Sequence, residues 1–415
     1  MQIVIIAGGE GKRMKPLTTH KSLYPLLGKS LISHLCTNLN TKKNKIYIVT
    51  SPSSLDDFKN DLNDPNVLYA VQPVANGMAG AMITAESILD LNDSILVLSA
   101  AKLQEPSIYK LMLDEIGKNP KVALLATRKI EKYKDGGYLK IAGDKVVAII
   151  EKPGADNMPS PYYKLILDYF PKASEFIDYL KTAKTDRDDV YEVGLSNYLR
   201  DIGANKLVVG GAHVSIKHGY NILDVMDMGL ATMLKPGIAK TACIAKSAVI
   251  DGDVQIDEGA KIFEHAVIKG PCYIGKNVVI GNGSLVRGSC IEEGSQVGYG
   301  CEIARSYIGP GTKGHKYYVG DSIIEGRVNL SAGTVLANYR FDHQEVSVTM
   351  AAGKVATGRK KFGSIIARDT ITGVNTSLMP GTVVGSHVTI GSGCVVKGYI
   401  PDNSIIKPIF SNYEK

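Results

Sequence analysis

A glycine-rich loop near the start of the chain has the composition of a phosphate-binding site. Gly8, Gly9 and Gly11 follow a short β-branched run, and Lys12 and Arg13 come directly after them. Glycines let the backbone approach a phosphate chain, whose charge is neutralised by main-chain N–H groups and basic side chains. An ordinary tight turn is the alternative explanation for each glycine. The loop with its basic flank predicts binding of a nucleoside phosphate.

The carboxylates that chemistry on a nucleoside triphosphate needs are missing at the expected place. Such chemistry normally uses acidic side chains that hold Mg2+. The predicted strand 94–98 is instead followed by Ser99, Ala100, Ala101 and Lys102. Lys102 would place a positive charge where the metal is expected, but an ammonium group is not a metal ligand. We therefore expect phosphate binding without a magnesium site in this half of the chain.

Length and composition describe a globular chain of two domains. Of the 415 residues, 44% are hydrophobic and 21% are charged, and this length exceeds one ordinary core. The formal charge of +7 suits anionic small substrates, although a solvated surface explains it equally well. Because no basic patch carries interleaved aromatic residues, we expect no nucleic acid partner.

Cysteine usage and the first apolar run favour a cytoplasmic location. The six cysteines form no CxxC pair and no cluster with metal-ligand spacing, which indicates reduced, structural thiols. The run Ile3–Ala7 is too short for a signal peptide or a membrane span. We therefore expect no membrane partner.

Residues 1–233 alternate strand-like and helix-like stretches. Strands are predicted at 2–7, 45–50, 68–71, 94–98, 121–127 and 146–150, and helices at 29–40 and 80–91, among others. This alternation predicts βαβ units and a Rossmann-like α/β domain with a mostly parallel sheet. Ligands bind such sheets at the carboxyl ends of the strands, which is where Gly8–Arg13 falls.

After Pro236 and Gly237 an aliphatic residue recurs every six residues. The run is Ile244, Ile250, Ile256, Ile262, Ile268, Ile274, Ile280 and Val286, and it returns at Ile366, Thr372, Leu378, Val384, Ile390 and Val396. This period matches neither a helix nor an alternating strand and is the hexapeptide signature of a parallel β-helix. Residues 306–362 interrupt the period with polar, aromatic and basic residues. Since function in a solenoid tends to lie on interruptions, we expect a site there.

The motifs of both halves resemble those of one enzyme family. Residues 7–18, Lys21, Gly28 with Lys29, 72–79 and 151–153 resemble the sugar-1-phosphate nucleotidyltransferases. With the six-residue repeats behind them, the whole chain resembles the bifunctional uridylyltransferase/glucosamine-1-phosphate acetyltransferases, especially their archaeal form. The resemblance implies a left-handed parallel β-helix and a homotrimer with sites between subunits.

The resemblance assigns ligand contacts to the N-terminal domain. It implies that the triphosphate of UTP, or a UDP-sugar, is held by Gly8, Gly9, Gly11, Arg13 and Lys21. Gln72 would read the edge of the base, and Gly77 would leave room beside it. Gly137 and Glu151 would contact the sugar, although an exposed charge at a strand end is the alternative for Glu151.

The chain departs from the family pattern around the metal. Ala101 stands where the family has an aspartate, and Ser215 stands near the place of a second ligand. An asparagine that would touch the sugar is replaced near Lys164. Without carboxylates a metal cannot bridge the phosphates, and charge build-up on the transferred phosphorus is not stabilised. We therefore expect weak or absent nucleotidyl transfer.

The segments 314–321, 328–334 and 337–342 resemble the acetyltransferase half of the same family. Acyl transfer from a thioester needs a base for the amine and donors for the oxyanion. The resemblance implies that His315, whose imidazole titrates in the useful range, deprotonates the 2-amino group of glucosamine 1-phosphate. It implies that Asn338 orients the substrate or stabilises the tetrahedral intermediate. Further residues would contact the substrate (Arg287, Tyr318, Asn329, Tyr339) and acetyl-CoA (Ala332, Arg359, Lys360).

Ordinary structural roles are the alternatives for these residues. A histidine on a solenoid is usually a surface or packing residue, and Arg287 or the run 359–361 could be solvated charge. Arg305 would take the place of a lysine that many relatives carry in the same coil. Basic residues expected near Gln344 and Ser347 are missing, which leaves the choice between glucosamine and galactosamine open.

The sequence thus predicts three segments and leaves three functions in competition. Residues 1–233 form the nucleotidyltransferase-like domain, 238–408 the β-helix acetyltransferase domain and 409–415 a tail. The leading function is acetyl-CoA-dependent N-acetylation of an amino-sugar 1-phosphate, beside a weak or inactive nucleotidyltransferase. A fully bifunctional enzyme, which would use Mg2+ and UTP, is disfavoured by Ala101 and Ser215. A non-catalytic sensor of sugar nucleotides is disfavoured by the intact acetyltransferase motifs.

Overall fold

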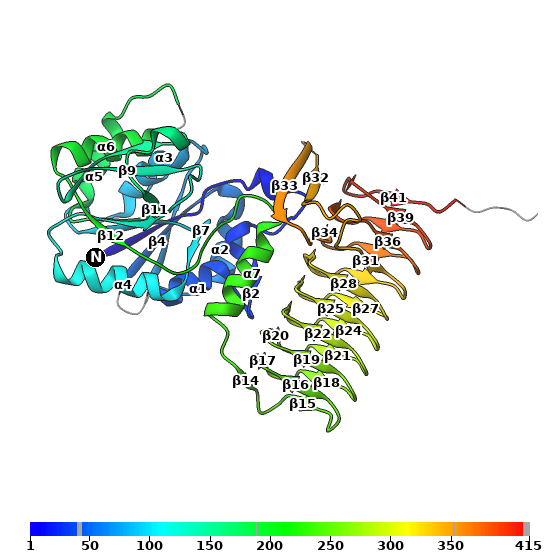
Figure 1. Cartoon of the computed structure of the whole chain (residues 1–415). Helices are drawn as coiled ribbons and strands as arrows, with labels where there is room; N and C mark the ends of the chain where they lie inside the picture. Colours follow the sequence, from blue (N-terminus) through cyan, green and yellow to red (C-terminus); the bar gives the residue numbers. More distant parts are fainter. Residues whose placement is uncertain (40–43, 188, 352, 410–415) are drawn as a thin grey trace, which may run out of the picture. The chain divides into compact units, whose positions relative to one another are not determined.

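The computed structural model describes residues 1–39, 44–187, 189–351 and 353–409, so the expected tail lies outside the described residues apart from Ile409. Two compact units are present, and the coils of the second are stacked side by side in Figure 1. The first unit is Met1–Glu10 with Ser30–Ser215, and the second is Gly11–Lys29 with Ile216–Lys415. The short segment Gly11–Lys29 therefore packs with the C-terminal half and not with the rest of the expected domain 1–233.

The first unit is built on a mixed sheet in the order β10-β9-β11-β6-β1-β4-β5, in which β8 also pairs with β11 and β12 pairs with β8, so the sheet is mixed and not mostly parallel as expected. Strands β1, β4, β5 and β6 are parallel, whereas β9, β10 and β11 are antiparallel to their neighbours. The strands are β1 Gln2–Ile6, β4 Lys45–Thr50, β5 Val67–Val71, β6 Ile95–Ser99, β8 Leu124–Lys129, β9 Gly137–Ala142, β10 Lys145–Glu151, β11 Tyr162–Phe170 and β12 Asn205–Val208. All six predicted strands are confirmed, and so is the α/β class.

Helices cover this sheet and short elements complete the unit. The helices are α1 Leu31–Asn38, α2 Leu55–Asp61, α3 Gly77–Ala85, α4 Pro106–Lys118, α5 Ala173–Thr182 and α6 Val190–Asp201. Its short strands are β7 Lys102–Gln104 and β13 His213–Ser215, and its 3-10 turns are η3 Pro52–Ser54, η4 Glu86–Ile88 and η5 Ala155–Asn157. The segment Gly11–Lys29 of the second unit contains η1 Lys12–Met14, η2 Lys21–Leu23 and β2 Pro25–Leu26, and β2 pairs with β3 Lys29–Ser30. The two predicted helices correspond to α1 and to α3 with η4. Among the described residues, no helix combines the length and apolarity needed to cross a membrane.

The second unit contains a parallel β-helix with three sheets, and a regular coil contributes one strand to each sheet. The first sheet is β14 Gly237–Ile238, β17 Val254–Ile256, β20 Cys272–Ile274, β23 Cys290–Ile291, β26 Tyr307–Ile308, β29 Ile323–Ile324, β34 Ser364–Ile366, β37 Thr382–Val384 and β40 Tyr399–Ile400. The second is β15 Cys243–Ile244, β18 Lys261–Ile262, β21 Val279–Ile280, β24 Gln296–Val297, β27 Lys313–Gly314, β30 Asn329–Leu330, β35 Ile371–Thr372, β38 Thr389–Ile390 and β41 Ile405–Ile406. The third is β16 Val249–Asp251, β19 Val267–Lys269, β22 Leu285–Arg287, β25 Glu302–Ala304, β28 Tyr318–Gly320, β31 Val335–Leu336, β36 Ser377–Leu378 and β39 Val395–Val396. This is the left-handed β-helix that the resemblance implies.

The aliphatic residues of the six-residue period form the core of the β-helix. Most of them are buried inside the coils, where each stacks on the residue one coil away. The six cysteines are free thiols, and five of them are buried, in agreement with the structural role expected for them. The hexapeptide prediction is therefore confirmed by the packing.

The expected interruption over 306–362 is wrong for its first part, because regular coils continue through β26 to β31. Two local changes hid them from the sequence pattern. After Val286 some corner loops are one residue shorter, so the buried aliphatic positions no longer recur every six residues. Gly314 takes an inward position without a side chain, since an added Cβ would lie 2.6 Å from the ring of Tyr317. The buried Tyr317 ring fills that layer instead.

The true insertion is a hairpin after β31, formed by β32 Val346–Met350 and β33 Gly353–Arg359. It packs beside helix α7 Asn221–Thr232 through Arg359. The Nη2 atom of Arg359 donates to Asp224 at 2.6 Å and to Asp227 at 2.7 Å. These two ion pairs tie the insertion to α7 within the second unit.

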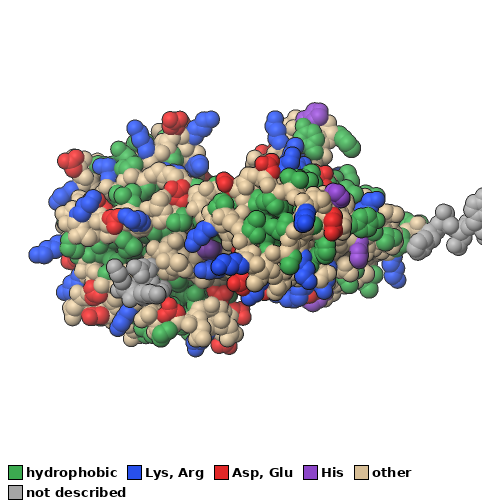
Figure 2. All heavy atoms as spheres, turned by 90° about the horizontal axis from the view of Figure 1, so that it is seen from below, with side chains coloured by type: hydrophobic (Ala, Val, Ile, Leu, Met, Phe, Trp, Pro, Cys, Tyr) green, Lys and Arg blue, Asp and Glu red, His purple; other side chains and the backbone are tan. Residues whose placement is uncertain are grey.

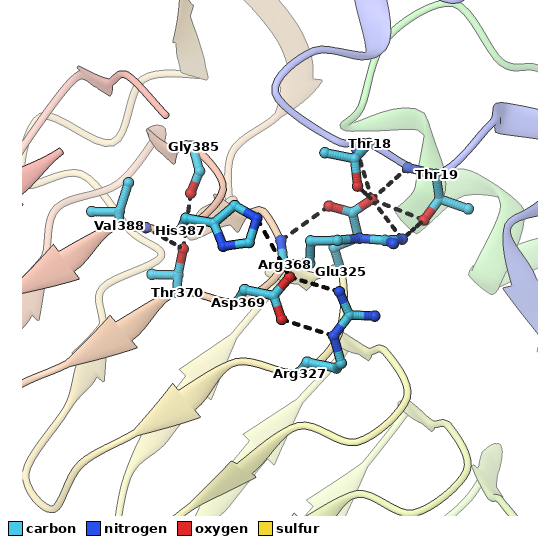
Figure 3. Close-up of polar contacts among 10 residues, drawn as sticks. All are labelled: Thr18, Thr19, Glu325, Arg327, Arg368, Asp369, Thr370, Gly385, His387 and Val388. Carbon is cyan, nitrogen blue, oxygen red and sulfur yellow. Dashed lines mark hydrogen bonds and ion pairs between the residues drawn. The ribbon is translucent and has the colours of Figure 1, made fainter. Parts of the chain in front are cut away.

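Buried carboxylates anchor the segment Gly11–Lys29 on the β-helix. Glu325 accepts hydrogen bonds from the main-chain N–H groups of Thr18 at 2.7 Å and Thr19 at 2.6 Å, and from both hydroxyls (Figure 3). Glu292 accepts from the N–H of Gly28 at 3.1 Å. Because the Glu325 and Glu292 side chains are almost fully buried, these contacts fix the segment firmly.

Glu292 makes the stability of this unit depend on pH. Burial raises the pKa of its carboxyl from 4.5 to about 7, against the opposing hydrogen bonds from Cys290 and the main chain. The folded protein therefore keeps a proton that the unfolded chain has released in this pH window, so the free energy of unfolding falls as pH rises through it. In Glu292→Gln, the loss of unfolding free energy across this pH window should be smaller by up to about 3 kcal/mol.

Denaturant unfolding on either side of this pH window tests the expectation. The neighbouring variant Glu293→Gln, at an exposed position, should keep the pH dependence of the unmodified protein. An identical pH dependence in Glu292→Gln and the unmodified protein would contradict the assigned pKa.

Candidate functional site

The first half of the glycine-rich loop lies in the α/β unit beside the predicted base-reading residue. An added Cβ on Gly8 would lie 2.6 Å from Oε1 of Gln72. The Nε2 of Gln72 donates to Oδ1 of Asn76 at 2.7 Å and to the carbonyl of Gly77 at 3.2 Å. Gly77 begins α3 with a φ of 82°, a conformation that favours glycine. The structure therefore brings Gly8, Gln72 and Gly77 together, with Gly9 next in the chain.

The second half of the loop lies in the other unit. Gly11 adopts a φ of 63° and caps η1, which contains Arg13. Burial lowers the pKa of Lys21, and the positive charge of Arg13 lowers it further. Two cations that repel each other in this way favour an anion between them. Arg13 and Lys21 are thus brought together as the phosphate-binding prediction requires.

The predicted sugar contacts also lie together in the α/β unit. Gly137 and Glu151 are paired across β9 and β10, and an added Cβ on Gly137 would lie 3.2 Å from Oε2 of Glu151. Burial raises the pKa of Glu151, while Lys152, Lys102 and Lys164 oppose this rise. Glu151 is half-buried among lysines, so it is not the freely exposed strand-end charge of the alternative reading.

The expected metal position does not fit a divalent cation. Ser215 pairs directly with Lys102 across β13 and β7, and Ala101 precedes Lys102, so both departures from the family pattern meet at one place. Within the described parts of the chain, no three His, Cys, Asp or Glu side chains gather into a group that could hold a metal ion. Magnesium needs oxygen ligands, and this position offers an alanine methyl, a hydroxyl and an ammonium group.

A buried ion pair lies beside the sugar contacts. Lys164 donates to Oδ2 of Asp168 at 2.7 Å, and the hydroxyl of Tyr191 donates to the same oxygen at 2.9 Å. Burial raises the pKa of Asp168, and the nearby charge of Lys164 lowers it in part. Only 6% of the Lys164 side chain and none of the Asp168 side chain is exposed. The sequence patterns missed this pair, for which charged residues inside an apolar run were the available signal.

In the β-helix, the predicted substrate contacts Arg287 and Tyr318 lie on strands β22 and β28 of the third sheet, with β25 between them. Arg287 of β22 aligns with Ala304 of β25 and Gly320 of β28, while Glu302 aligns with Tyr318. Nη2 of Arg287 donates to Oε1 of Glu302 at 2.7 Å. More than a third of each of these two side chains is exposed, so the pair is weak. Arg287 can therefore exchange its partner for a substrate phosphate at low cost.

The side chains of Tyr318 and Asn338 lie close together beside Gly320. A Cβ added to Gly320 would lie 2.5 Å from the Tyr318 hydroxyl and 2.5 Å from Nδ2 of Asn338. Burial raises the pKa of Tyr318, while the positive charge of Arg305 and a hydrogen bond with the Asn338 amide oppose this rise. The absence of a side chain at Gly320 is therefore what allows these two predicted site residues to come together.

The remaining predicted residues of the β-helix lie on the second sheet and on the corners that follow its strands. His315 follows β27 and is exposed, with its N–H donating to the carbonyl of Leu330 at 3.0 Å. Asn329 aligns with Lys313 in the same sheet, and the carbonyl of Ala332 accepts from the main chain of the next coil at 2.9 Å. Within the described residues no hydrogen bond joins the His315 ring to Tyr318 or Asn338.

The basic and aromatic residues of the insertion have other partners. The hydroxyl of Tyr339 contacts Nδ1 of His343 at 2.9 Å, and Lys361 lies over the Tyr339 ring. Arg359 is held by α7, as described above, whereas Lys360 is exposed. On the face drawn in Figure 2, lysine and arginine side chains are interspersed with acidic ones over most of the surface. Arg359 is thus not placed for a cofactor phosphate, and Lys360 remains accessible.

Comparison with known proteins agrees with both halves of the fold. Residues 2–202 match the nucleotidyl transferase family model, and residues 237–356 match the GMPPB C-terminal domain model. The bifunctional protein GlmU of Methanococcus maripaludis is 28% identical over 435 residues, covering 98% of this chain and 97% of that protein. The bifunctional sugar-1-phosphate nucleotidylyltransferase/acetyltransferase of Sulfurisphaera tokodaii is 28% identical over 408 residues, covering 95% and 97%. Along almost its full length the chain is therefore similar to bifunctional sugar-1-phosphate nucleotidyltransferase/acetyltransferases, as the sequence motifs of both halves implied.

Proposed function

We propose that the β-helix unit transfers the acetyl group of acetyl-CoA to the amino group of an amino-sugar 1-phosphate. Glucosamine 1-phosphate fits best, in the synthesis of UDP-N-acetylglucosamine. The observation that carries the proposal is the arrangement of Arg287 and Tyr318 on the third sheet, separated by the one strand β25, with Asn338 beside Tyr318. A guanidinium, a phenol and an amide on one surface suit a phosphate, a sugar ring and an amine. The cytoplasm is the compartment in which we expect the reaction.

The reaction follows from ordinary acyl-transfer chemistry. The amine nitrogen attacks the thioester carbonyl, a C–N bond forms and the C–S bond breaks. His315 takes the proton that the amine loses and returns it to the departing thiolate of coenzyme A. Arg287 neutralises the sugar phosphate, and Asn329 and Tyr339 complete the substrate contacts. Ala332 and Lys360 would contact acetyl-CoA, and Arg359 is omitted because α7 already holds it.

The α/β unit has, in this proposal, a binding role and little transfer activity. Its glycine-rich loop, Gln72 and Glu151 keep the groups needed for a nucleotide and a sugar. Lys102 and Lys164 supply positive charge there, but an ammonium group lacks the Lewis acidity that a bound Mg2+ would supply. The second candidate is a fully bifunctional enzyme, which is favoured by the names of the full-length relatives.

Two separate assays on one purified protein distinguish these functions. Release of the coenzyme A thiol measures acetyl transfer to glucosamine 1-phosphate. Pyrophosphate release from UTP and N-acetylglucosamine 1-phosphate in Mg2+ measures nucleotidyl transfer. The proposal expects the first activity and a trace of the second. Two strong activities would favour the bifunctional enzyme, and tight UDP-sugar binding without either activity would favour the regulatory function.

The β-helix is also the surface on which we expect a homotrimer to form. Its third sheet exposes outward aliphatic side chains, among them Val249 at 50% and Val395 at 71%. Solvent-exposed aliphatic columns of this kind favour association. Light scattering of the purified chain should give three chains of 44.6 kDa each. A monomer at working concentration would contradict this expectation.

A further inference from the structure

A buried carboxylate lies behind the residues of the proposed acetyl-transfer site. Asp321 follows β28 and exposes only 3% of its surface. Arg305 donates from Nε to Oδ1 at 2.7 Å and from Nη2 to Oδ2 at 2.7 Å. The Nδ2 of Asn338 donates to the same Oδ2. The carboxylate thus has a guanidinium on one side and the side-chain amide of a predicted site residue on the other.

Two backbone hydrogen bonds also hold Asp321 in place. Its N–H donates to the carbonyl of Ala304 at 2.8 Å, and its carbonyl accepts from Gly363 at 2.9 Å. Its φ of 47° lies in the left-handed region that non-glycine residues adopt rarely. A residue kept in such a conformation by its surroundings presents its side chain in one direction.

The chemistry of the carboxylate decides which end of the amide it contacts. With Arg305 on both oxygens, Asp321 is ionised and can only accept hydrogen bonds, so the NH2 end of Asn338 must face it. The same NH2 group adjoins the hydroxyl of Tyr318 over Gly320. Within the described residues, no hydrogen bond reaches the carbonyl oxygen Oδ1 of Asn338. The acceptor end of this amide is therefore the end that remains for a ligand.

We propose that Asp321, with Arg305 as its counter-ion, is a positioning residue that makes Asn338 present its carbonyl oxygen to the attacking amine. The inference rests on the proposed function, and it selects between the two roles open to Asn338. An acceptor can hold an N–H of the amine so that the nitrogen lone pair points at the thioester carbonyl. An acceptor cannot stabilise the oxyanion, which must find its N–H donors elsewhere. In this proposal Arg305 acts through Asp321.

The β-helix contains a matched control for this pair. Arg327 donates from Nε to Oδ1 of Asp369 at 2.7 Å and from Nη2 to Oδ2 at 2.6 Å (Figure 3). Asp369 also has a left-handed φ, of 60°. Nε2 of His387 lies 3.8 Å from Oδ2 of Asp369, and Arg368 is a further positive neighbour. Among the described residues no asparagine amide donates to Asp369, so Asp369→Asn removes the same kind of ion pair without touching an amide.

Single substitutions test whether Asp321 acts on catalysis. Asp321→Asn should lower kcat for acetylation of glucosamine 1-phosphate by about tenfold or more, the usual scale for a supporting group. The KM for acetyl-CoA should change little, because the amide does not bind the cofactor. Asp369→Asn should match the unmodified protein in both constants. Equal kcat values for Asp321→Asn and Asp369→Asn would overturn the positioning role.

An exchange of the two side chains tests the orientation of the amide. Asn338→Asp alone places two carboxylates against each other and should abolish activity. In Asp321→Asn/Asn338→Asp, the new amide donates to the new carboxylate, whose second oxygen again offers an acceptor to the amine. The double variant should therefore recover at least about tenfold in kcat over Asn338→Asp. A double variant as inactive as Asn338→Asp, with an intact fold, would show that Asn338 is needed as a donor.

Thermal unfolding separates a failure of this inference from a failure of the proposed function. The double variant should have a higher Tm than Asn338→Asp, because the exchange restores a hydrogen bond across the two positions. If the unmodified protein does not acetylate glucosamine 1-phosphate, the proposed function fails, and the Tm comparison still reports the amide orientation. A double variant with a Tm no higher than Asn338→Asp would overturn the orientation itself.

Discussion

Replacing His315 with alanine should lower kcat for acetylation of glucosamine 1-phosphate by about 100-fold or more, the usual scale for loss of a proton-transfer group. The exposed ring at the end of β27 can reach a bound substrate without breaking a protein hydrogen bond, since the described residues provide none to it. Binding of acetyl-CoA should change little, because other groups hold the cofactor. The measurement is steady-state thiol release at saturating acetyl-CoA.

A pH series and a second histidine control this prediction. Raising the pH should restore part of the rate of His315→Ala, because the amine then loses its proton to solvent. His265 lies at an exposed corner of an earlier coil, and His265→Ala should have the kcat of the unmodified protein. A normal rate in His315→Ala would remove the general base from the proposed mechanism and strengthen the regulatory function.

Adding two carboxylates should raise nucleotidyl transfer above the trace that we expect of the unmodified protein. Ala101→Asp together with Ser215→Asp places acidic side chains on either side of the Lys102 pairing position, where magnesium would find oxygen ligands. We expect Mg2+-dependent pyrophosphate release from UTP to rise well above the trace of the unmodified protein. Recovery should be partial, because Lys102 and Lys164 keep their positive charges near the metal.

The single variants and the metal control complete this test. Ala101→Asp alone should give less activity than the pair, since one carboxylate holds Mg2+ poorly. Activity gained by the pair should disappear when the metal is chelated. Strong Mg2+-dependent turnover by the unmodified protein would contradict the prediction, and it would mean that other groups hold the metal in a bifunctional enzyme.

Regular patterns in the sequence predicted the regular parts of the fold. The strands of the parallel core and the six-residue stacking of aliphatic residues needed only local periodicity. Strand β11 was missed because Lys164 and Asp168 interrupt its apolar run, and a buried charge can be understood only when its partner is known. The coils β26 to β31 were misread because the Tyr317 ring fills the layer that Gly314 leaves empty.

The same contrast applies to the candidate site. The family resemblance implied the roles of Gln72, Gly137, Glu151 and the acetyltransferase group, and these roles stay predictions. The pairing of Arg359 with α7 depends on contacts more than a hundred positions apart, which no local pattern contains. The Asp321 contact with Asn338 likewise spans 17 positions along the chain. Partners of charged groups are therefore what the sequence alone could not supply.

The anchoring of Gly11–Lys29 by Glu325 and Glu292 bears on how this chain can evolve. Half of the nucleotide loop is folded as part of the β-helix, so a gene shortened after codon 233 would encode a loop without its supporting carboxylates. Conversely, a β-helix expressed alone would leave the glutamates without the N–H groups that satisfy them. Recombination cannot exchange either half as an independent module. The N-terminal region would be retained even without metal ligands, because its segment Gly11–Lys29 folds as part of the second unit.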